Sequence, residues 1–163
     1  MDRSLTSYLT FKLGDELFAA SVSKVIEILE IPKITKVPRS PEFMRGVVNL
    51  RGNVLSVIDS RNKFGLPSVE DTVSTCIIVM NIQIENQEIT LGLIADAVKE
   101  VVEIDKLTIQ ALPEIGSKYK SEFIEGMVKS GEQFIMILNI DLLFSSHEAN
   151  IIQDVQELTT EVR

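Results

Sequence analysis

The side chains that most often carry out catalysis are scarce in this sequence. Among its 163 residues there is one histidine, His147, and one cysteine, Cys76. The sole histidine lies near an acidic tail, which does not favour a histidine-based triad. A metal site with several histidines has no second histidine to draw on, and Cys76 has no base near it in sequence. No segment matches a phosphate-binding loop. The sequence predicts no enzymatic activity, no metal site and no other cofactor, and it predicts Cys76 as a buried, inert residue.

A binding role is predicted instead by an arginine placed between two apolar strands. Residues 46–50 and 53–59 are rich in β-branched side chains, which favour extended structure. Arg51 and Gly52 separate them, and glycine adopts the positive φ that a tight hairpin turn requires. We therefore expect Arg51 to stand at a hairpin tip as a fixed, outward-facing cation.

The hairpin belongs to a pattern that occurs twice. Residues 43–49 (FMRGVVN) match residues 123–129 (FIEGMVK) in their Phe, Gly and Val positions, 80 positions later. Upstream, residues 22–28 resemble residues 95–101. Internal repeats fix the architecture of a chain, so we predict two similar small barrels or sheets that share a core. The alternative is a chance similarity between apolar hairpins.

Composition narrows the class of protein. Hydrophobic residues make up 45% of the chain, which predicts a packed core. No apolar run approaches the ~18 residues of a membrane span, and no secretory signal is present, so a cytoplasmic location without direct membrane insertion is expected. The net charge of −8 argues against binding to nucleic acid or to anionic membranes, since both require clustered cations.

The remaining elements are mostly short strands. A helical turn is expected over 21–24, a proline-stiffened loop up to Pro41, and a surface excursion over 105–121. The other predicted strands cover residues 5–13, 17–20, 25–29, 75–84, 89–94 and 98–104.

The end of the chain has a different pattern. We divide the chain into a globular domain, 1–146, and an acidic tail, 147–163. In the tail, Ile151, Val155, Leu158 and Val162 form one apolar stripe of an amphipathic helix. Such a stripe must be buried against another surface. Docking on this chain's own barrel and docking on a partner protein are the two alternatives.

The residues described so far resemble the CheW family of chemotaxis coupling proteins. The similarity covers residues 8–144 and is most specific in GVVNLRG (46–52) followed by DSRNKFG (59–65). Residues 11–15, 25–28 and 34–41 agree further, as does the second copy from Gly126 to Asp141. The family usually has proline where this chain has Ser56 and leucine where it has Ser60.

The resemblance implies a fold and a function. The fold is all-β with short helices: two five-stranded SH3-like barrels that share a hydrophobic core. The function is that of a non-catalytic adaptor, which couples the cytoplasmic tip of a chemoreceptor to the regulatory domain of the histidine kinase CheA. Rings with other CheW copies are a further implied assembly. The receptor helix would lie in the groove between the barrels, an established mode of helix recognition.

The resemblance also implies which residues bind the receptor. Family positions matching Val25, Glu27, Gly46 and Arg51 are involved. Val25 would join three further residues, Ile28, Met44 and Val48, as apolar walls of the groove. Arg51 would reach a receptor carboxylate or helix-end carbonyls, and Glu27 a receptor cation. Several of these residues have a simpler interpretation: core packing for Val25 and Ile28, backbone geometry for Gly46, and a solvated charge for Glu27 and Arg51.

Two other functions remain open. The first is a CheW-like adaptor of another chemosensory pathway, such as one that controls surface motility. The second is a small-molecule sensor that uses a cavity between the barrels.

Overall fold

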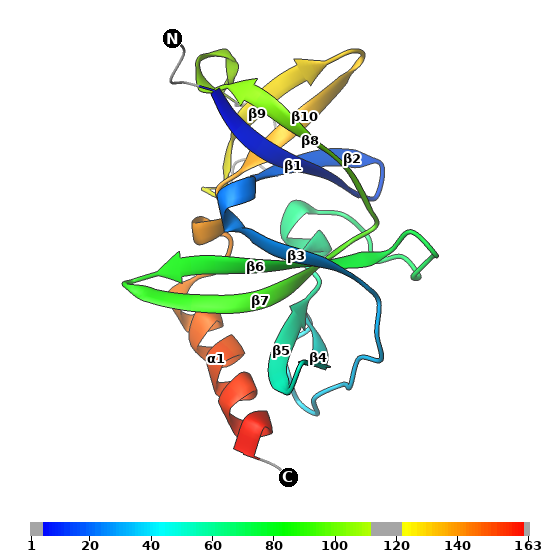
Figure 1. Ribbon diagram of the computed structural model, residues 1–163, viewed down its shortest axis with the longest axis vertical. Helices are drawn as coiled ribbons and strands as arrows, with labels where there is room; N and C mark the ends of the chain where they lie inside the picture. Colours follow the sequence, from blue (N-terminus) through cyan, green and yellow to red (C-terminus); the bar gives the residue numbers. More distant parts are fainter. Residues whose placement is uncertain (1–4, 112–121, 162–163) are drawn as a thin grey trace.

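The computed structural model describes residues 5–111 and 122–161, which form two five-stranded sheets and one α-helix (Figure 1). The strands are β1 (Leu5–Leu13), β2 (Glu16–Ser21), β3 (Val25–Glu30), β4 (Met44–Leu50), β5 (Asn53–Ile58), β6 (Cys76–Ile84), β7 (Gln87–Ala95), β8 (Ala97–Asp105), β9 (Ile124–Ser130) and β10 (Gln133–Leu138). Short 3-10 helices are η1 (Val22–Lys24), η2 (Arg61–Phe64), η3 (Lys106–Thr108) and η5 (Ile140–Leu142), and α1 spans Ser146–Glu161.

Each sheet forms one SH3-like barrel, and the two barrels lie one above the other in Figure 1. Barrel A has the strand order β8-β1-β2-β10-β9, and barrel B has the order β3-β6-β7-β5-β4. Barrel B is continuous in sequence. Barrel A is assembled from both ends of the chain, because β1 pairs with β2 and with β8. The predicted all-β architecture is confirmed.

The sequence repeat corresponds to a structural repeat. The two barrels have equivalent strand orders. Strands β3, β6, β7, β5 and β4 of barrel B correspond, in this order, to β8, β1, β2, β10 and β9 of barrel A. The segments that precede β4 and β9 also form equivalent β-bridges. Thr35 pairs with Val47 beside β4, and Gln110 pairs with Met127 beside β9. The two repeats therefore build two barrels of the same topology: the matched strands of the first copy, β3 to β5, lie in barrel B, and those of the second copy, β8 to β10, lie in barrel A.

A large apolar core joins the barrels. It contains Phe11 and Phe18 from barrel A, Ile58 and Met80 from barrel B, and Phe64 from η2. Each barrel also has a smaller core of its own. Strand β6 is buried on both faces because alternate residues point into the shared core and into the core of barrel B. Cys76 is buried in the shared core, as predicted.

The predicted local elements agree with the structure with small shifts. The helical turn is η1, and the hairpin turn lies at Arg51 and Gly52. Both turn residues have positive φ, 51° and 87°, which matches the right-handed twist of the flanking strands. The start of the predicted surface excursion is instead the end of β8 and η3, and residues 112–121 lie outside the described part of the chain.

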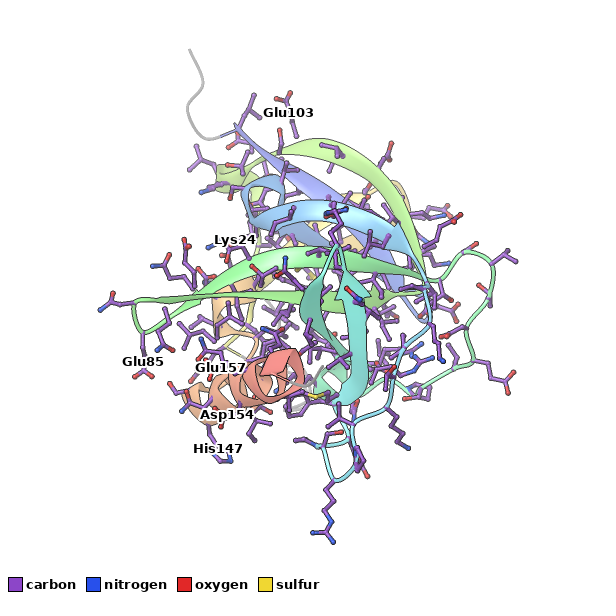
Figure 2. All side chains as sticks on the ribbon, turned by 60° about the horizontal axis from the view of Figure 1, so that its bottom comes forward. Lys24, Glu85, Glu103, His147, Asp154 and Glu157 are labelled. Atoms are coloured by element: carbon purple, nitrogen blue, oxygen red, sulfur yellow. The ribbon has the colours of Figure 1, made fainter. Side chains whose placement is uncertain are left out.

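Helix α1 packs on barrel B of its own chain. Ile152 is fully buried in the shared core, and Ala149 is 2% exposed. The outer side of α1 carries His147, Asp154 and Glu157 (Figure 2). Of the two alternatives for the predicted apolar stripe, docking on the chain's own barrel is the one observed. Of the predicted stripe, Ile151 and Val155 pack against the shared core, whereas Val162 and the side chain of Leu158 lie outside the described part of the chain. The division of the chain at residue 146 stays a prediction. None of the described helices is long and apolar enough to cross a bilayer.

Ser56, one of the two departures from the family pattern, anchors this helix. Its backbone N–H donates to Gln156 Oε1 at 2.9 Å, and its hydroxyl donates to the carbonyl of Ile152 at 3.3 Å. A proline at this position lacks both donors. Ser60, the other departure, is fully buried and precedes η2.

We expect Ile152→Ala to lower the free energy of unfolding by about 2–4 kcal/mol, because it removes a fully buried side chain and leaves a cavity. Urea denaturation would measure the loss. Asp154→Ala, on the exposed side of the same helix, is the matched control and should change stability by less than about 0.5 kcal/mol. Equal stability of both variants would contradict the observed docking.

Candidate binding site

The predicted site is centred on an ion pair at the rim of barrel B. Arg51, at the tip of the β4–β5 hairpin, donates from Nη2 to Glu27 Oε2 on β3. The Arg51 side chain is 68% exposed and the Glu27 side chain is 27% exposed. The pair therefore connects the two edge strands of barrel B, β3 and β4, and leaves most of the guanidinium accessible. The sequence predicted both charges but not their contact with each other.

Strand β3 presents different residues on its two faces. Val25 and Ile28 lie opposite residues of β6 that belong to the shared core, whereas Glu27 lies opposite Val79 of the barrel B core. Directly opposed residues lie on one face of a sheet, and the irregularity between Val25 and Glu27 brings Val25 and Ile28 to the same face. Val25 and Ile28 thus face the junction between the barrels, and Glu27 faces the mouth of barrel B.

Two isoleucines on β3 are exposed apolar residues. Ile28 is 45% exposed and Ile26 is 53% exposed. Among the described strands, β3 pairs with β6 alone and forms one edge of its sheet, so a partner can approach it from the open side. Ile26 is absent from the predicted set, although the β-branched run 25–28 contains it. The exposed surface of β3 therefore includes an apolar residue that the sequence analysis did not single out.

The predicted residues of β4 face the interior. Met44 is 4% exposed and packs in the shared core, and Val48 is 3% exposed and packs in the core of barrel B. Gly46 is also buried, and a Cβ atom there would lie 2.4 Å from the carbonyl oxygen of Thr35. These three residues support the hairpin that carries Arg51. In this conformation they offer a partner little accessible surface.

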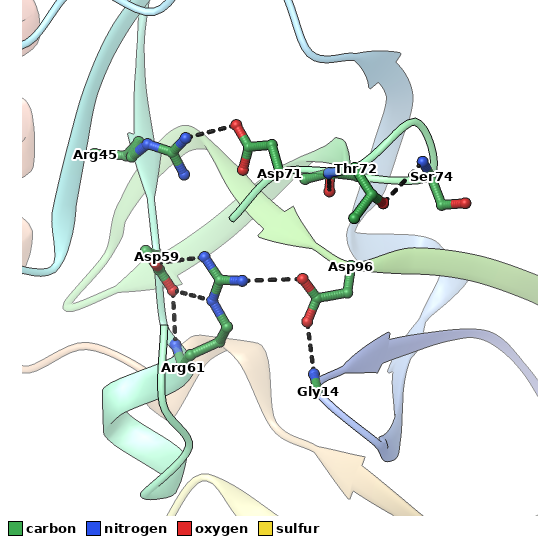
Figure 3. A network of polar contacts seen from close by, with 9 residues as sticks. Gly14, Arg45, Asp59, Arg61, Asp71, Thr72, Ser74 and Asp96 are labelled. Atoms are coloured by element: carbon green, nitrogen blue, oxygen red, sulfur yellow. Dashed lines mark hydrogen bonds and ion pairs between the residues drawn. The ribbon is translucent and has the colours of Figure 1, made fainter. Parts of the chain in front are cut away.

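A buried ion-pair network lies between the barrels and was not predicted (Figure 3). Arg61 is 1% exposed, and it donates to both carboxylate oxygens of Asp59 at 2.9 and 2.7 Å. It also donates to Asp96 at 2.9 Å, and Asp96 accepts the backbone N–H of Gly14 at 2.6 Å. Asp59 follows β5 of barrel B, and Gly14 lies in the β1–β2 turn of barrel A. The network therefore holds one barrel against the other.

The network lowers the pKa of Asp59. Burial alone would raise this pKa, but the side-chain and backbone hydrogen bonds from Arg61 lower it below its ordinary value. The pKa of Glu148 is lowered in the same way: burial opposes the shift, and the hydrogen bond from Lys63 produces it. A lowered pKa means that the folded protein binds these protons less readily than the unfolded chain does.

Stability should therefore fall in acid. The contribution of Asp59 is fully present above the pKa of the unfolded chain, near pH 4, and is lost as the pH drops through the lower pKa of the folded state. We expect the free energy of unfolding, measured in urea at a series of pH values, to decrease below about pH 5. Asp59→Asn should flatten this dependence. A decrease of the same size in that variant would assign the effect to other groups.

The described residues hold no cluster of metal-ligating side chains. No three of their His, Cys, Asp and Glu side chains are grouped so as to bind a metal ion. Burial raises the pKa of Cys76, which makes its thiol a poor nucleophile. The described surface offers instead an exposed cation, Arg51, at the rim of barrel B and two exposed isoleucines on β3, the strand of its ion-pair partner Glu27. Fold and site together define a class of small proteins, paired SH3-like barrels with an edge strand available for binding a partner.

Comparisons with known proteins identify the family. The model of the CheW-like domain matches residues 7–148, and the chain belongs to this family of chemotaxis adaptor proteins. It is 31% identical over 148 residues to the chemotaxis protein CheW of Klebsiella aerogenes, covering 91% of this chain and 87% of the relative. It is 32% identical over 148 residues to the probable chemotaxis protein CheW of Rhizobium etli, covering 91% of both chains.

A solved structure supports the same assignment. The crystal structure of the scaffolding protein TtCheW from Thermoanaerobacter tengcongensis superimposes with a TM-score of 0.75 at 33% identity. The similarity covers 88% of this chain and 90% of that one. The family resemblance and the fold predicted from the sequence are thus confirmed.

Proposed function

We propose that this chain is a non-catalytic chemotaxis adaptor that couples the cytoplasmic tip of a chemoreceptor to the regulatory domain of the kinase CheA. The observation that carries the receptor half is the rim of barrel B, where the exposed Arg51 guanidinium is bound to Glu27 of β3, the strand that also carries the exposed residues Ile26 and Ile28. The family relationship supports the kinase half. In this role the protein works in the cytoplasm beside membrane-bound receptor arrays, where contacts with further adaptor copies form rings.

Receptor recognition follows from the two faces of β3. A receptor helix with one apolar stripe packs against Val25, Ile26 and Ile28, which is helix-in-groove binding. Arg51 binds a receptor carboxylate with the N–H donors that Glu27 leaves free, since a guanidinium has five donors in a planar fork. Glu27 holds the arginine in place, and it is also within reach of a receptor cation. The receptor does not contact the buried residues of β4 in this proposal. Their role is to fix the β4–β5 hairpin that carries Arg51, and they are Met44, Gly46 and Val48.

We expect Arg51→Ala to weaken binding of a receptor cytoplasmic fragment by about tenfold or more, because a hydrogen bond to a charged partner is lost. Affinity for the CheA regulatory domain and the circular dichroism spectrum should stay unchanged, since the exposed Arg51 contributes little to packing. Isothermal titration calorimetry with both partners measures the two affinities separately.

The matched control is Lys129→Ala, an exposed cation near the equivalent hairpin of barrel A. It should leave receptor binding intact. Unchanged receptor affinity in Arg51→Ala would remove Arg51 from the site, and an unfolded variant would show a structural role. A wild-type chain that binds neither partner would overturn the proposed function.

A further inference from the structure

Asp141 connects barrel A to the beginning of the proposed receptor-binding strand. It lies in η5, which follows β10 of barrel A. Its Oδ2 atom accepts from Lys24 Nζ at 2.8 Å, and its Oδ1 atom accepts from the backbone N–H of Gln83 at 2.8 Å. Asn139 fixes the carboxylate's own segment by accepting the N–H of Asp141 at 3.1 Å. One carboxylate thus binds both η1, which precedes β3, and strand β6 of barrel B.

Both of these segments control the position of β3. Lys24 (labelled in Figure 2) is the last residue of η1 and directly precedes Val25. Gln83 lies on β6, the neighbour of β3 in the sheet, three residues beyond the partner of Val25. The Asp141 side chain therefore binds both the residue that precedes β3 and the end of the adjacent strand β6.

The repeat provides a counterpart for this clasp with the charges reversed. In the counterpart, Arg61 of η2 binds Asp96, which directly precedes β8, and Asp96 accepts the N–H of Gly14 from the β1–β2 hairpin. In both clasps a 3-10 helix that follows a hairpin of one barrel binds the residue that directly precedes an edge strand of the other barrel, β3 or β8. In both, the acid also accepts an N–H from a hairpin.

The two clasps differ in burial. Arg61 is 1% exposed, whereas the side chains of Lys24 and Asp141 are 30% and 31% exposed. A partly exposed pair contributes little to global stability and can be removed without leaving a buried charge unpaired. The Lys24–Asp141 clasp therefore adds little to the fold as a whole, yet it acts at the start of β3.

We propose that Asp141 is a positioning residue for the receptor site: from barrel A it holds Lys24 and the start of β3 in the orientation that receptor binding requires. The inference rests on the proposed function. With the clasp closed, Val25 and Ile28 face the junction between the barrels, and Glu27 points to Arg51. With the clasp removed, the start of β3 keeps its ladder to β6 and the packing of Val25 but loses its ion pair with η5. Binding the receptor then requires that strand to be ordered at the same time, which reduces affinity.

The test uses the full chain with two single variants, Asp141→Asn and Lys24→Met. We expect each to weaken the affinity for a receptor cytoplasmic fragment about three- to tenfold, as for the loss of one hydrogen-bonded charge. Affinity for the CheA regulatory domain and the melting temperature should stay close to wild type. Amide hydrogen exchange should become faster in β3 and remain unchanged in β7, a local effect that general destabilisation would not produce.

Two controls make the outcome specific. Asp154→Asn removes an exposed carboxylate from α1 and should change neither affinity nor exchange. The reversed pair, Lys24→Asp with Asp141→Lys, should recover part of the affinity that Lys24→Asp loses alone.

Three results would contradict the positioning role of Asp141. Normal receptor affinity in Asp141→Asn would overturn it. So would a loss confined to Lys24→Met, since Lys24 would then contact the receptor itself, and so would an equal loss of kinase binding. A wild-type chain that fails to bind the receptor fragment would instead overturn the proposed function.

Discussion

Arg61→Met should destabilise the protein by about 3–5 kcal/mol, the range found when one member of a buried charge cluster is removed. The methionine replaces a guanidinium that is 1% exposed and leaves Asp59 and Asp96 without their cation. The two carboxylates then repel each other between the barrels. Urea denaturation measures the loss, and near-ultraviolet circular dichroism reports whether the shared core remains packed.

Arg45→Met is the matched control, because Arg45 forms a neighbouring ion pair with Asp71 in the same region (Figure 3). The two side chains of this pair are 34% and 29% exposed, so its loss should cost less than about 1 kcal/mol. Asp59→Asn combined with Arg61→Met should be less harmful than Arg61→Met alone. Equal stability of Arg45→Met and Arg61→Met would contradict the role given to the buried network.

Gly46→Ala should cost about 3 kcal/mol or more, because two penalties coincide at this position. The residue has φ of 152°, a conformation that side chains rarely adopt. A Cβ atom would also lie 2.4 Å from Thr35 O and 2.7 Å from a methyl carbon of Ile34. Thr35 exchanges two backbone hydrogen bonds with Val47 at 2.9 and 2.8 Å, and the methyl group would force this segment off β4.

Gly14→Ala is the control that carries the backbone penalty without the steric clash. Gly14 has φ of 62°, and no other atom lies within 4 Å of the place that an added Cβ would occupy, so only the backbone penalty of about 1 kcal/mol applies. Gly126, the counterpart of Gly46 in barrel A, would place its Cβ 2.4 Å from Gln110 O. Gly126→Ala should therefore destabilise the protein as well. A Gly46→Ala variant no less stable than Gly14→Ala would show that the Thr35 segment moves aside freely.

The repeat made much of the fold predictable from sequence. Phe43 and Phe123 occupy matching places, and each accepts a backbone bond from the residue after its hairpin, Asp59 and Asn139. Local signals were also sufficient for the turn at Arg51 and for η1, since both depend on neighbouring residues. The predicted charges Glu27 and Arg51 are at the rim, because a hairpin tip and an edge strand are both exposed.

Features that depend on distant residues were not predictable. Arg61 and Asp96 are 35 positions apart, and nothing in their neighbourhoods indicates that they meet inside the protein. Met44 and Val48 lie on a strand with two buried faces, so alternation gave no sign of which side a partner would reach. Ser56 meets Gln156 across 100 positions, and a serine in a strand pattern does not indicate a helix against it.

The discontinuity of barrel A has a consequence for how the protein is made. A nascent chain that has reached residue 95 contains every strand of barrel B, but only the β1–β2 hairpin of barrel A. The partners of that hairpin, β8 and β10, are translated only afterwards, and the ladder that finally forms joins Leu5 to Asp105. Until then the first strands made carry open edges and half of an apolar core, the features that promote mispairing. Translation that stops within barrel A should thus release a folded barrel B bearing an unpaired, aggregation-prone N-terminal hairpin.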